Sequence, residues 1–178
     1  MSGSADPAIQ SVCSTLDRVN DDSTFTIRLA TAADQARVEH CVTAAYEHYV
    51  EIIGRPPAPM TEDYARLISE GVVHVAQRDG SILGLIVMWP ESDYYYVDNL
   101  AVFPYAQGSG LGRVLLCEAE AAARRSGLNK IMLYTNEVMT ANVAYYPRRG
   151  FVETHRSTDS GYSRVYFVKQ LTSADAAT

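Results

Sequence analysis

The sequence predicts an α+β domain, in which helices pack on the faces of a mixed β-sheet. The chain has 178 residues, of which 47% are apolar and 20% charged, as is typical of one folded core. Two β runs joined by Asp79-Gly80 predict an antiparallel hairpin. Between residues 94 and 136 a β run, a helical pattern and another β run follow one another, which predicts a parallel pair of strands. We therefore expect a sheet that contains both kinds of pairing.

The first elements are a strand and two helices. Residues 25–30 have the composition of a strand. Thr31, with Asp34 three residues later, is a variant of the helix capping box. Apolar residues then recur at helical spacing as far as Gly54, where we expect the first helix to end. A short second helix is predicted over residues 61–69.

Three β runs occupy the middle of the chain. Residues 72–78 and 81–89 form the predicted hairpin, and a third run covers residues 94–103. A strand that follows a hairpin is commonly its neighbour in the sheet.

The remaining elements complete the sheet from the other side. A long helix is predicted over residues 110–126, and residues 130–136 return as a strand parallel to the preceding one. A last helix is expected over about 140–149, followed by two strands that begin at residues 151 and 164.

The ends of the chain differ in composition from the rest. We expect a flexible leader at residues 1–23, one domain over 24–171 and a flexible tail at 172–178. The leader has no basic start followed by an apolar stretch, so it is not a signal peptide, and a cytoplasmic protein is expected. No apolar run approaches the roughly 20 residues of a membrane helix, so no membrane partner is expected.

Charge and cysteine content exclude further classes. The net charge is −6, whereas a nucleic-acid surface normally shows a basic stripe, so no nucleic-acid partner is expected. Cys13, Cys41 and Cys117 lack metal-ligand spacing, and so do the histidines, so no metal is expected. We expect the cysteines to be reduced and mostly buried.

A glycine-rich stretch, AQGSGLGR, connects the third β run to the long helix and has Gly108, Gly110 and Gly112 at alternate positions. Such turns bind phosphate, because free N–H groups and the positive end of the helix dipole converge there. The Walker pattern is excluded, because Gly112 is followed by arginine and valine instead of lysine and serine or threonine. The spacing also excludes the dinucleotide-binding pattern G-x-G-x-x-G.

Gln107, Gly110 and Gly112 after a strand, followed downstream by YPRRGF at 146–151, resemble the GNAT superfamily of N-acyltransferases. The resemblance covers most of residues 25–170. It implies a mostly antiparallel sheet of six to seven strands, a splayed parallel pair of strands four and five, and about four flanking helices. It also implies transfer of an acetyl group from acetyl-CoA to a primary amine of a small molecule, protein or peptide. Members are often dimers, so a homodimer is one expectation.

The resemblance further implies where acetyl-CoA lies. Its diphosphate would accept hydrogen bonds from the loop amides, and its pantetheine arm would pair with the fourth strand. The implied contacts are Leu100, Ala101, Val102, Gln107, Gly108, Ser109, Gly110, Leu111, Gly112, Arg113 and Tyr146. An asparagine commonly caps the next helix in the family, but Met139 stands at that position. Asn136 and Asn142 are both candidates to replace it.

Acyl transfer requires a neutral amine, donors for the oxyanion of the tetrahedral intermediate, and an acid for the leaving thiolate. Tyr146 matches the tyrosine that is the general acid of the family, and the implied oxyanion donor is the backbone amide of Leu100. Pro147 follows Tyr146 and is expected to bend the helix. Tyr145 is therefore the alternative acid.

The general base is less constrained by the sequence. Many relatives have a glutamate where this chain has Tyr96 or Tyr134. The two-residue period of a strand predicts that one face carries Tyr96, Asp98, Leu100 and Val102. Asp98, acting through water, is the predicted base, with Glu137 or a chain of waters as alternatives.

Two other functions fit parts of the sequence. A non-catalytic acyl-CoA-binding or regulatory module is the main alternative, because the strand glutamates are missing. A nucleoside-triphosphate binder is disfavoured by the absent Walker pattern. The acceptor is expected to contact segments 46–66 and 153–165, which mix aromatic residues with both signs of charge, so no single acceptor can be inferred.

Overall fold

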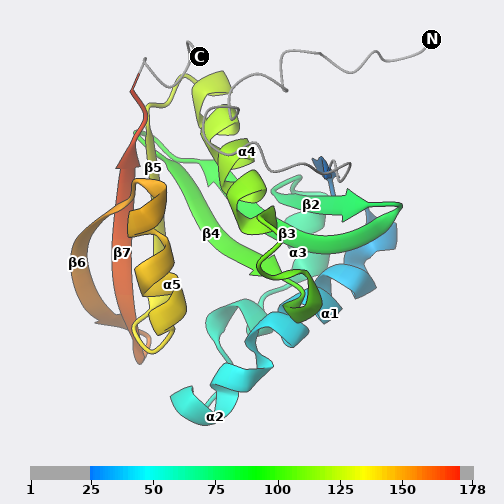
Figure 1. Cartoon of the computed structure of the whole chain (residues 1–178), viewed down its shortest axis with the longest axis horizontal. Helices are drawn as coiled ribbons and strands as arrows, with labels where there is room; N and C mark the ends of the chain where they lie inside the picture. The colour runs from blue at the N-terminus through cyan, green and yellow to red at the C-terminus, as the bar shows by residue number, and fades with distance from the viewer. Residues whose placement is uncertain (1–24, 173–178) are drawn as a thin grey trace.

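The computed structural model describes residues 25–172 and confirms the α+β class (Figure 1). Seven strands form one sheet in the order β1-β2-β3-β4-β5-β7-β6. The strands are β1 Thr26–Leu29, β2 Val73–Arg78, β3 Ser81–Pro90, β4 Tyr95–Val102, β5 Lys130–Asn136, β6 Val152–Asp159 and β7 Tyr162–Gln170. Only the β4–β5 pair is parallel. The predicted leader and residues 173–178 of the predicted tail lie outside the described residues.

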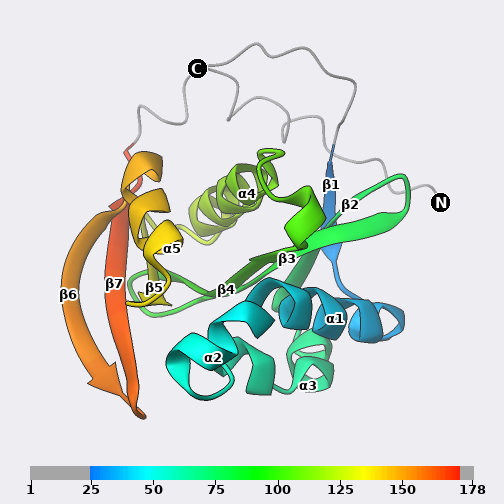
Figure 2. The same cartoon turned by 60° about the horizontal axis from the view of Figure 1, so that its bottom comes forward.

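Helices cover both faces of this sheet. In Figure 2, α4 and α5 lie on one face and α1, α2 and α3 on the other. The helices are α1 Gln35–Tyr46, α2 Val50–Ile53, α3 Tyr64–Ser69, α4 Leu111–Arg125 and α5 Thr140–Tyr145. α1 packs on β3 and β4, and α4 packs on β3, β4 and β5. Both sides of the central strands are therefore buried.

Two local predictions are confirmed in detail. The carboxylate of Asp34 accepts a hydrogen bond from the backbone N–H of Thr31 at 2.8 Å, at the turn that leads into α1. Asp79 and Gly80 have φ angles of 52° and 75° between β2 and β3, so both adopt the left-handed conformation that a tight hairpin requires.

The first and last helices are shorter than predicted. α1 ends at Tyr46, and a 3₁₀ turn leads into α2, which is capped by Gly54 in the left-handed conformation. α5 ends at Tyr145, and a separate 3₁₀ turn covers Pro147–Arg149. Proline lacks the N–H that would continue the helical hydrogen bonds, so α5 ends at Tyr145, two residues before Pro147.

The parallel strands β4 and β5 separate within the sheet, as predicted. Their pairing covers Tyr95 to Val97 of β4 and Ile131 to Leu133 of β5. From Asp98 onward β4 leaves its neighbour and the gap widens (Figure 1). The opened edge of β4 faces the end of the glycine-rich loop and α5.

A β-bulge lies where the separation begins. Val87 of β3 pairs with Asn99, but Met88 pairs with Val97, so Asp98 is an extra residue in β4. A bulge bends its strand and increases the local twist. Its position therefore accounts for the divergence of β4 from β5.

The bulge also corrects the expected two-residue period. Tyr95 faces α4, because Arg125 and Glu118 of that helix are its charged neighbours. Leu100 faces α4 as well, since its side chain lies 3.9 Å from a Cβ built at Gly112. In a regular strand, side chains alternate between the two faces, so residues five apart, such as Tyr95 and Leu100, would lie on opposite faces. They share a face because the bulge interrupts the alternation once. The expectation that Tyr96, two residues before the bulge, shares a face with Leu100 is therefore wrong.

The cysteine expectations are confirmed only in part. Cys41 is free and buried. Cys117 is disulfide-bonded, so the prediction of a reduced thiol is wrong there, because sequence spacing does not show which cysteines pair. Cys13 lies outside the described residues.

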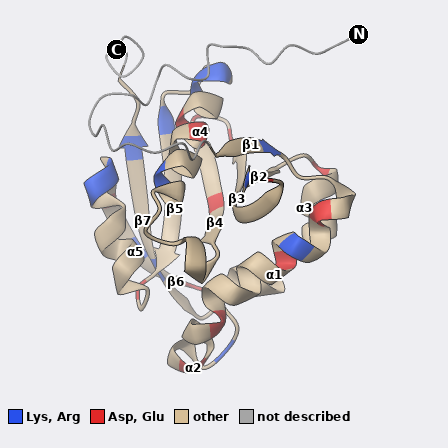
Figure 3. Cartoon of the chain, turned by 45° about the vertical axis from the view of Figure 1, so that its right-hand side comes forward, with Lys and Arg blue, Asp and Glu red and all other residues tan. Residues whose placement is uncertain are grey.

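The distribution of charge and the apolarity of the helices are relevant to binding of nucleic acid and of membranes. Figure 3 shows Lys and Arg dispersed among acidic and neutral segments and not gathered in one stripe. Among the described residues, no helix is both long enough and apolar enough to span a bilayer.

Candidate active site

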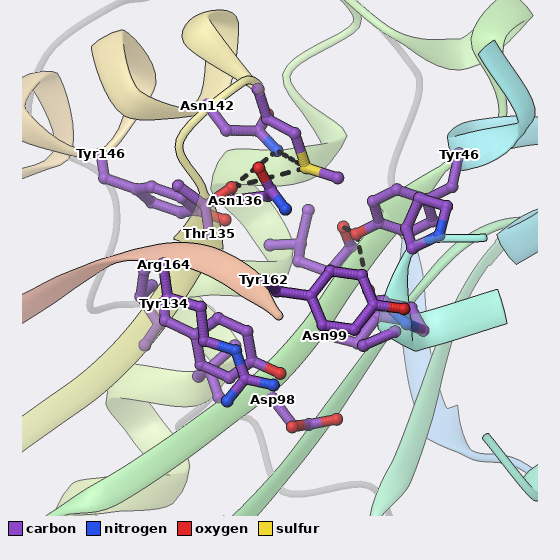
Figure 4. A pocket seen from close by; sticks show the side chains of 17 residues that line it. Tyr46, Asp98, Asn99, Tyr134, Thr135, Asn136, Asn142, Tyr146, Tyr162 and Arg164 are labelled. Atoms are coloured by element: carbon purple, nitrogen blue, oxygen red, sulfur yellow. Dashed lines mark hydrogen bonds between the residues drawn. The ribbon is translucent and has the colours of Figure 1, made fainter. Parts of the chain in front are cut away.

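A cavity opens where β4 and β5 separate (Figure 4). It passes through the gap, so both faces of the sheet contribute to its walls. Its lining comes from Val97–Leu100 of β4, Leu133–Asn136 of β5, Met139, Asn142 and Tyr146 at α5, Pro57–Pro59, Tyr46, and Tyr162 and Arg164 of β7. Of the predicted site residues, Asp98, Leu100, Asn136, Asn142 and Tyr146 therefore lie together.

The glycine-rich loop has unused hydrogen-bond donors. The amides of Gln107, Ser109 and Arg113 donate to backbone carbonyls of the same turn. No hydrogen bond to another described residue engages the amides of Gly108, Gly110, Leu111 and Gly112. These free N–H groups lie at the start of α4, where the helix dipole adds positive potential. The loop can therefore bind an anion through backbone alone.

The glycines of this loop are needed for different reasons. Gly110 has a φ of +85°, which strains any other residue, and a Cβ there would meet no atom within 4 Å. Gly112 has no positive φ, and a Cβ there would lie 3.1 Å from the hydroxyl of Tyr145. A substitution is therefore strained by the backbone conformation at Gly110 and limited by space at Gly112.

The edge of β4 that is not paired with β5 turns backbone groups toward the gap. The N–H of Phe103 donates to the carbonyl of Leu83 at 3.0 Å. Because hydrogen-bonded and non-bonded pairs alternate in an antiparallel ladder, Ala101 then faces β3, and the backbone groups of Leu100 and Val102 face the gap.

Two side chains support this orientation of β4. The Nε2 of Gln107 donates to the carbonyl of Val102 at 3.1 Å. The hydroxyl of Tyr46 lies 3.0 Å from the carbonyl of Leu100 and 2.7 Å from Oδ1 of Asn99. The N–H groups of Leu100 and Val102 point to the same side as their carbonyls, toward the gap between β4 and β5.

The two tyrosines at the end of α5 have separate positions. Tyr146 is buried, lines the cavity, and packs on Phe151 and Phe167 with ring centroids 5.8 and 5.5 Å away. Burial raises the pKa of its phenol well above the usual range. Tyr145 lies against the glycine-rich loop instead. Although Pro147 ends the helix, Tyr146 keeps helical angles, so the phenol points into the cavity.

Asp98 enters the cavity from the bulge (Figure 4). Burial, with a further contribution from the charge of Glu62, raises the pKa of its carboxyl to about 6. The charge of Arg164 and a hydrogen bond with Tyr96 act in the opposite direction. Asp98 is therefore largely ionised at neutral pH and still basic enough to accept a proton.

The other predicted groups divide between the cavity and the surface. Glu137, the alternative base, is exposed and bonded to Arg156 at 2.7 Å, and it does not line the cavity. Asn136 accepts a hydrogen bond from the amide of Val138 at 3.1 Å. Nδ2 of Asn142 lies 3.4 Å from the hydroxyl of Thr135.

The predicted acceptor segments reach the cavity only in part. Tyr46 and Tyr162 line it, together with Pro57–Pro59, whereas Tyr49 and His155 do not. The tip of the β6–β7 hairpin touches the chain before Pro57: Tyr162 donates to the carbonyl of Pro56 at 2.7 Å. This contact closes one side of the cavity.

Sequence reasoning missed a buried polar network beneath the cavity. Asn99 is 4% exposed, accepts from Tyr46, and donates to the hydroxyl of Tyr64 at 3.0 Å. Tyr64 in turn donates to the carbonyl of Pro59 at 2.9 Å. The network connects β4 to α1, α3 and the Pro57–Pro59 wall. The sequence signal for this network is an asparagine, Asn99, within a β run that is expected to be buried.

Within residues 25–172, no group of three or more His, Cys, Asp or Glu side chains is arranged to hold a metal ion.

Comparisons with known proteins agree with this geometry. Residues 31–151 match the model of the acetyltransferase (GNAT) family. The chain is 35% identical to the IAA acetyltransferase of Azospirillum brasilense over 81 residues, which are 44% of this chain and 53% of that protein. It is 43% identical to the mycothiol acetyltransferase of Geodermatophilus obscurus over 65 residues, 36% of this chain and 20% of that protein. The matches thus span about half of these relatives or less.

Solved structures share the fold. The PaiA N-acetyltransferase of Thermoplasma acidophilum, in complex with coenzyme A, superposes with a TM-score of 0.70 at 16% identity. The superposition covers 83% of this chain and 99% of that one. At this identity the likeness shows the arrangement of strands and helices and nothing finer.

Proposed function

Because this chain belongs to the acetyltransferase (GNAT) family, we propose that it is an N-acetyltransferase that transfers an acetyl group from acetyl-CoA to a primary amine. One observation carries the proposal. A loop of free amides and an unpaired strand edge converge on a cavity that also contains a buried tyrosine and a carboxylate.

Acetyl-CoA would enter from the face that carries α4 and α5. Its diphosphate would accept hydrogen bonds from the free amides between Gly108 and Gly112, with Arg113 as an additional cation. Its pantetheine arm would pair with Leu100 and Val102 as an added strand. The thioester would then reach the bulge of β4.

The acceptor amine would enter from the opposite face, where Asp98 lies. Asp98, directly or through water, would take a proton from the ammonium, and the neutral nitrogen would attack the thioester carbonyl carbon. The N–H of Leu100 would donate to the oxyanion of the tetrahedral intermediate. Direct transfer of this kind needs no acyl-enzyme.

Collapse of the intermediate breaks the carbon–sulfur bond. The thiolate would take its proton from Tyr146, which burial keeps neutral until that moment. The nitrogen loses its second proton, which returns to Tyr146 through water, so that one proton is released for each ammonium acetylated. A thiolate in the same apolar cavity is itself destabilised, which favours the transfer from Tyr146.

A panel of small amines and short peptides, tested with acetyl-CoA by release of free thiol and by mass spectrometry, tests the proposal. We expect acetylation of at least one primary amine. Binding of acetyl-CoA without turnover of any amine would instead indicate a non-catalytic acyl-CoA-binding module. Failure to bind acetyl-CoA would overturn the proposal.

A further inference from the structure

Five aromatic side chains form a continuous line across five strands. This aromatic row consists of Trp89, Tyr96, Tyr134, Tyr166 and His155, from β3, β4, β5, β7 and β6. Successive ring centroids are 5.1, 6.4, 5.7 and 4.3 Å apart. Three of the four steps join residues directly opposite each other in the strand register. The row is therefore set by the sheet itself.

The row lies on the face of the sheet away from α5. Phe167 packs on Tyr146 at the end of α5, so its neighbour Tyr166 points to the other side. The imidazole of His155 stacks on Tyr166 with an interplanar angle of 7°, and it is exposed. The rings of Tyr134 and Tyr166 are only partly buried. The row thus offers aromatic surface to an approaching molecule.

The middle of this row reaches the reaction site. Tyr134 lines the same cavity as Asp98, and the guanidinium of Arg164 holds its ring from one side at 4.3 Å. Arg164 is itself fixed by Asp159 at 2.6 Å. Many relatives have a glutamate at the place of Tyr96 or of Tyr134, whereas this chain has a tyrosine at both.

The charges beside the cavity indicate what the surface attracts. Asp98 and Arg164 both line the cavity, and Glu62 lies close enough to act on the charge of Asp98. Because Arg164 is paired with Asp159, the carboxylates of Asp98 and Glu62 favour an ammonium group, and the ring surface beside them favours a flat apolar body. A ligand that satisfies both carries its amine at one end and an aromatic ring at the other.

We propose that the aromatic row is the docking surface of the acceptor and that the acceptor is a primary amine bearing an aromatic ring. This inference rests on the proposed function. The ammonium lies at Asp98, and the ring stacks along Tyr134 and Tyr166. Ring–ring contacts favour an aromatic ligand over an alicyclic one of the same size, because only the former adds a quadrupole interaction to the apolar area.

Phenethylamine and cyclohexylethylamine are a matched pair for the test, because they differ only in the character of the ring. Calorimetry measures their binding to the protein–CoA complex, and steady-state kinetics measures kcat/KM with acetyl-CoA. We expect phenethylamine to be preferred by about fivefold in both measurements. The Tyr166→Leu variant should bring the ratio close to one. Tyr166→Phe should keep it, and so should Tyr105→Leu, which removes an exposed tyrosine outside the row.

Binding and kinetics test different claims: amine binding tests the aromatic docking surface, and acetylation tests the proposed function. Equal binding of the two amines, no binding of either, or an unchanged ratio in Tyr166→Leu would overturn the aromatic docking surface. Preferential binding of phenethylamine that depends on Tyr166, without acetylation of either amine, would support the surface and contradict the proposed function.

Discussion

The hydroxyl of Tyr145 lies against Gly112, so close that a Cβ added to the glycine would be 3.1 Å from it. The contact joins the end of α5 to the first turn of α4 at the glycine-rich loop. The two adjacent tyrosines therefore have different positions and roles. Tyr145 supports the loop, while Tyr146 points into the cavity.

Because of this contact, we expect the effects of substitutions at Gly112 and Tyr145 on the free energy of unfolding to be coupled. Gly112→Ala should lower the free energy of unfolding by about 1 kcal/mol, because a methyl group is forced against the hydroxyl. In the Tyr145→Phe background the cost should largely disappear, since the next ring atom, Cζ, lies 3.7 Å away. A double-mutant cycle by denaturant unfolding measures this coupling. Additive effects would contradict the contact.

The same arrangement predicts which tyrosine is the general acid. Tyr146→Phe should lower kcat by about 10²-fold, the low end for general acid catalysis, with acetyl-CoA affinity nearly unchanged. Tyr145→Phe should leave kcat within a few fold. Thiol-release kinetics and calorimetry on both variants check this. A loss confined to Tyr145→Phe would reverse the assignment.

Ionisation of Asp98 should make kcat/KM depend on pH. A base with a pKa of about 6 must lose its proton to act, so kcat/KM should rise with pH through this value and level off above it. Asp98→Asn should remove this limb and lower the plateau. A pH profile from 5 to 8 with a small amine measures both effects. An unchanged profile in the variant would exclude Asp98 as the base.

Asp98 should also cost stability at neutral pH. Its pKa in the folded state, about 6, is raised above its usual value of 3.8, so its favourable contribution is complete below about pH 4 and is lost as the pH rises through about 6. Asp98→Asn should therefore stabilise the protein at pH 7, by about 2 kcal/mol, and have little effect at pH 4. Denaturant unfolding at the two pH values provides the test. Equal effects at both would mean that the carboxylate is not buried.

Much of the fold could be predicted because its signals are local. Asp79-Gly80, Thr31 with Asp34, and the loop from Gln107 to Gly112 each need only a few neighbouring residues to specify a turn or a helix start. The parallel pairing of β4 and β5 followed from the crossover helix between them.

The details of the site depend on contacts distant in sequence. The bulge at Asp98 is defined by pairing with Val87 and Met88 of another strand, so a two-residue period read along β4 alone passed over it. The hydrogen bond from Tyr162 to Pro56 joins segments 106 residues apart, and no pattern within either segment indicates it. The motif that singled out Tyr146 lies within one short stretch of sequence, and the structure places this residue at the cavity.

Calorimetric titration with acetyl-CoA of the wild-type chain and of Gly110→Asp tests whether the glycine-rich loop binds the diphosphate. We expect micromolar or tighter binding by the wild type. We expect a loss of affinity of at least about 100-fold in the variant, because a carboxylate at this turn would strain the backbone and repel the diphosphate. No binding by the wild type, or equal affinity of the two proteins, would contradict the claim that the loop holds the diphosphate of acetyl-CoA.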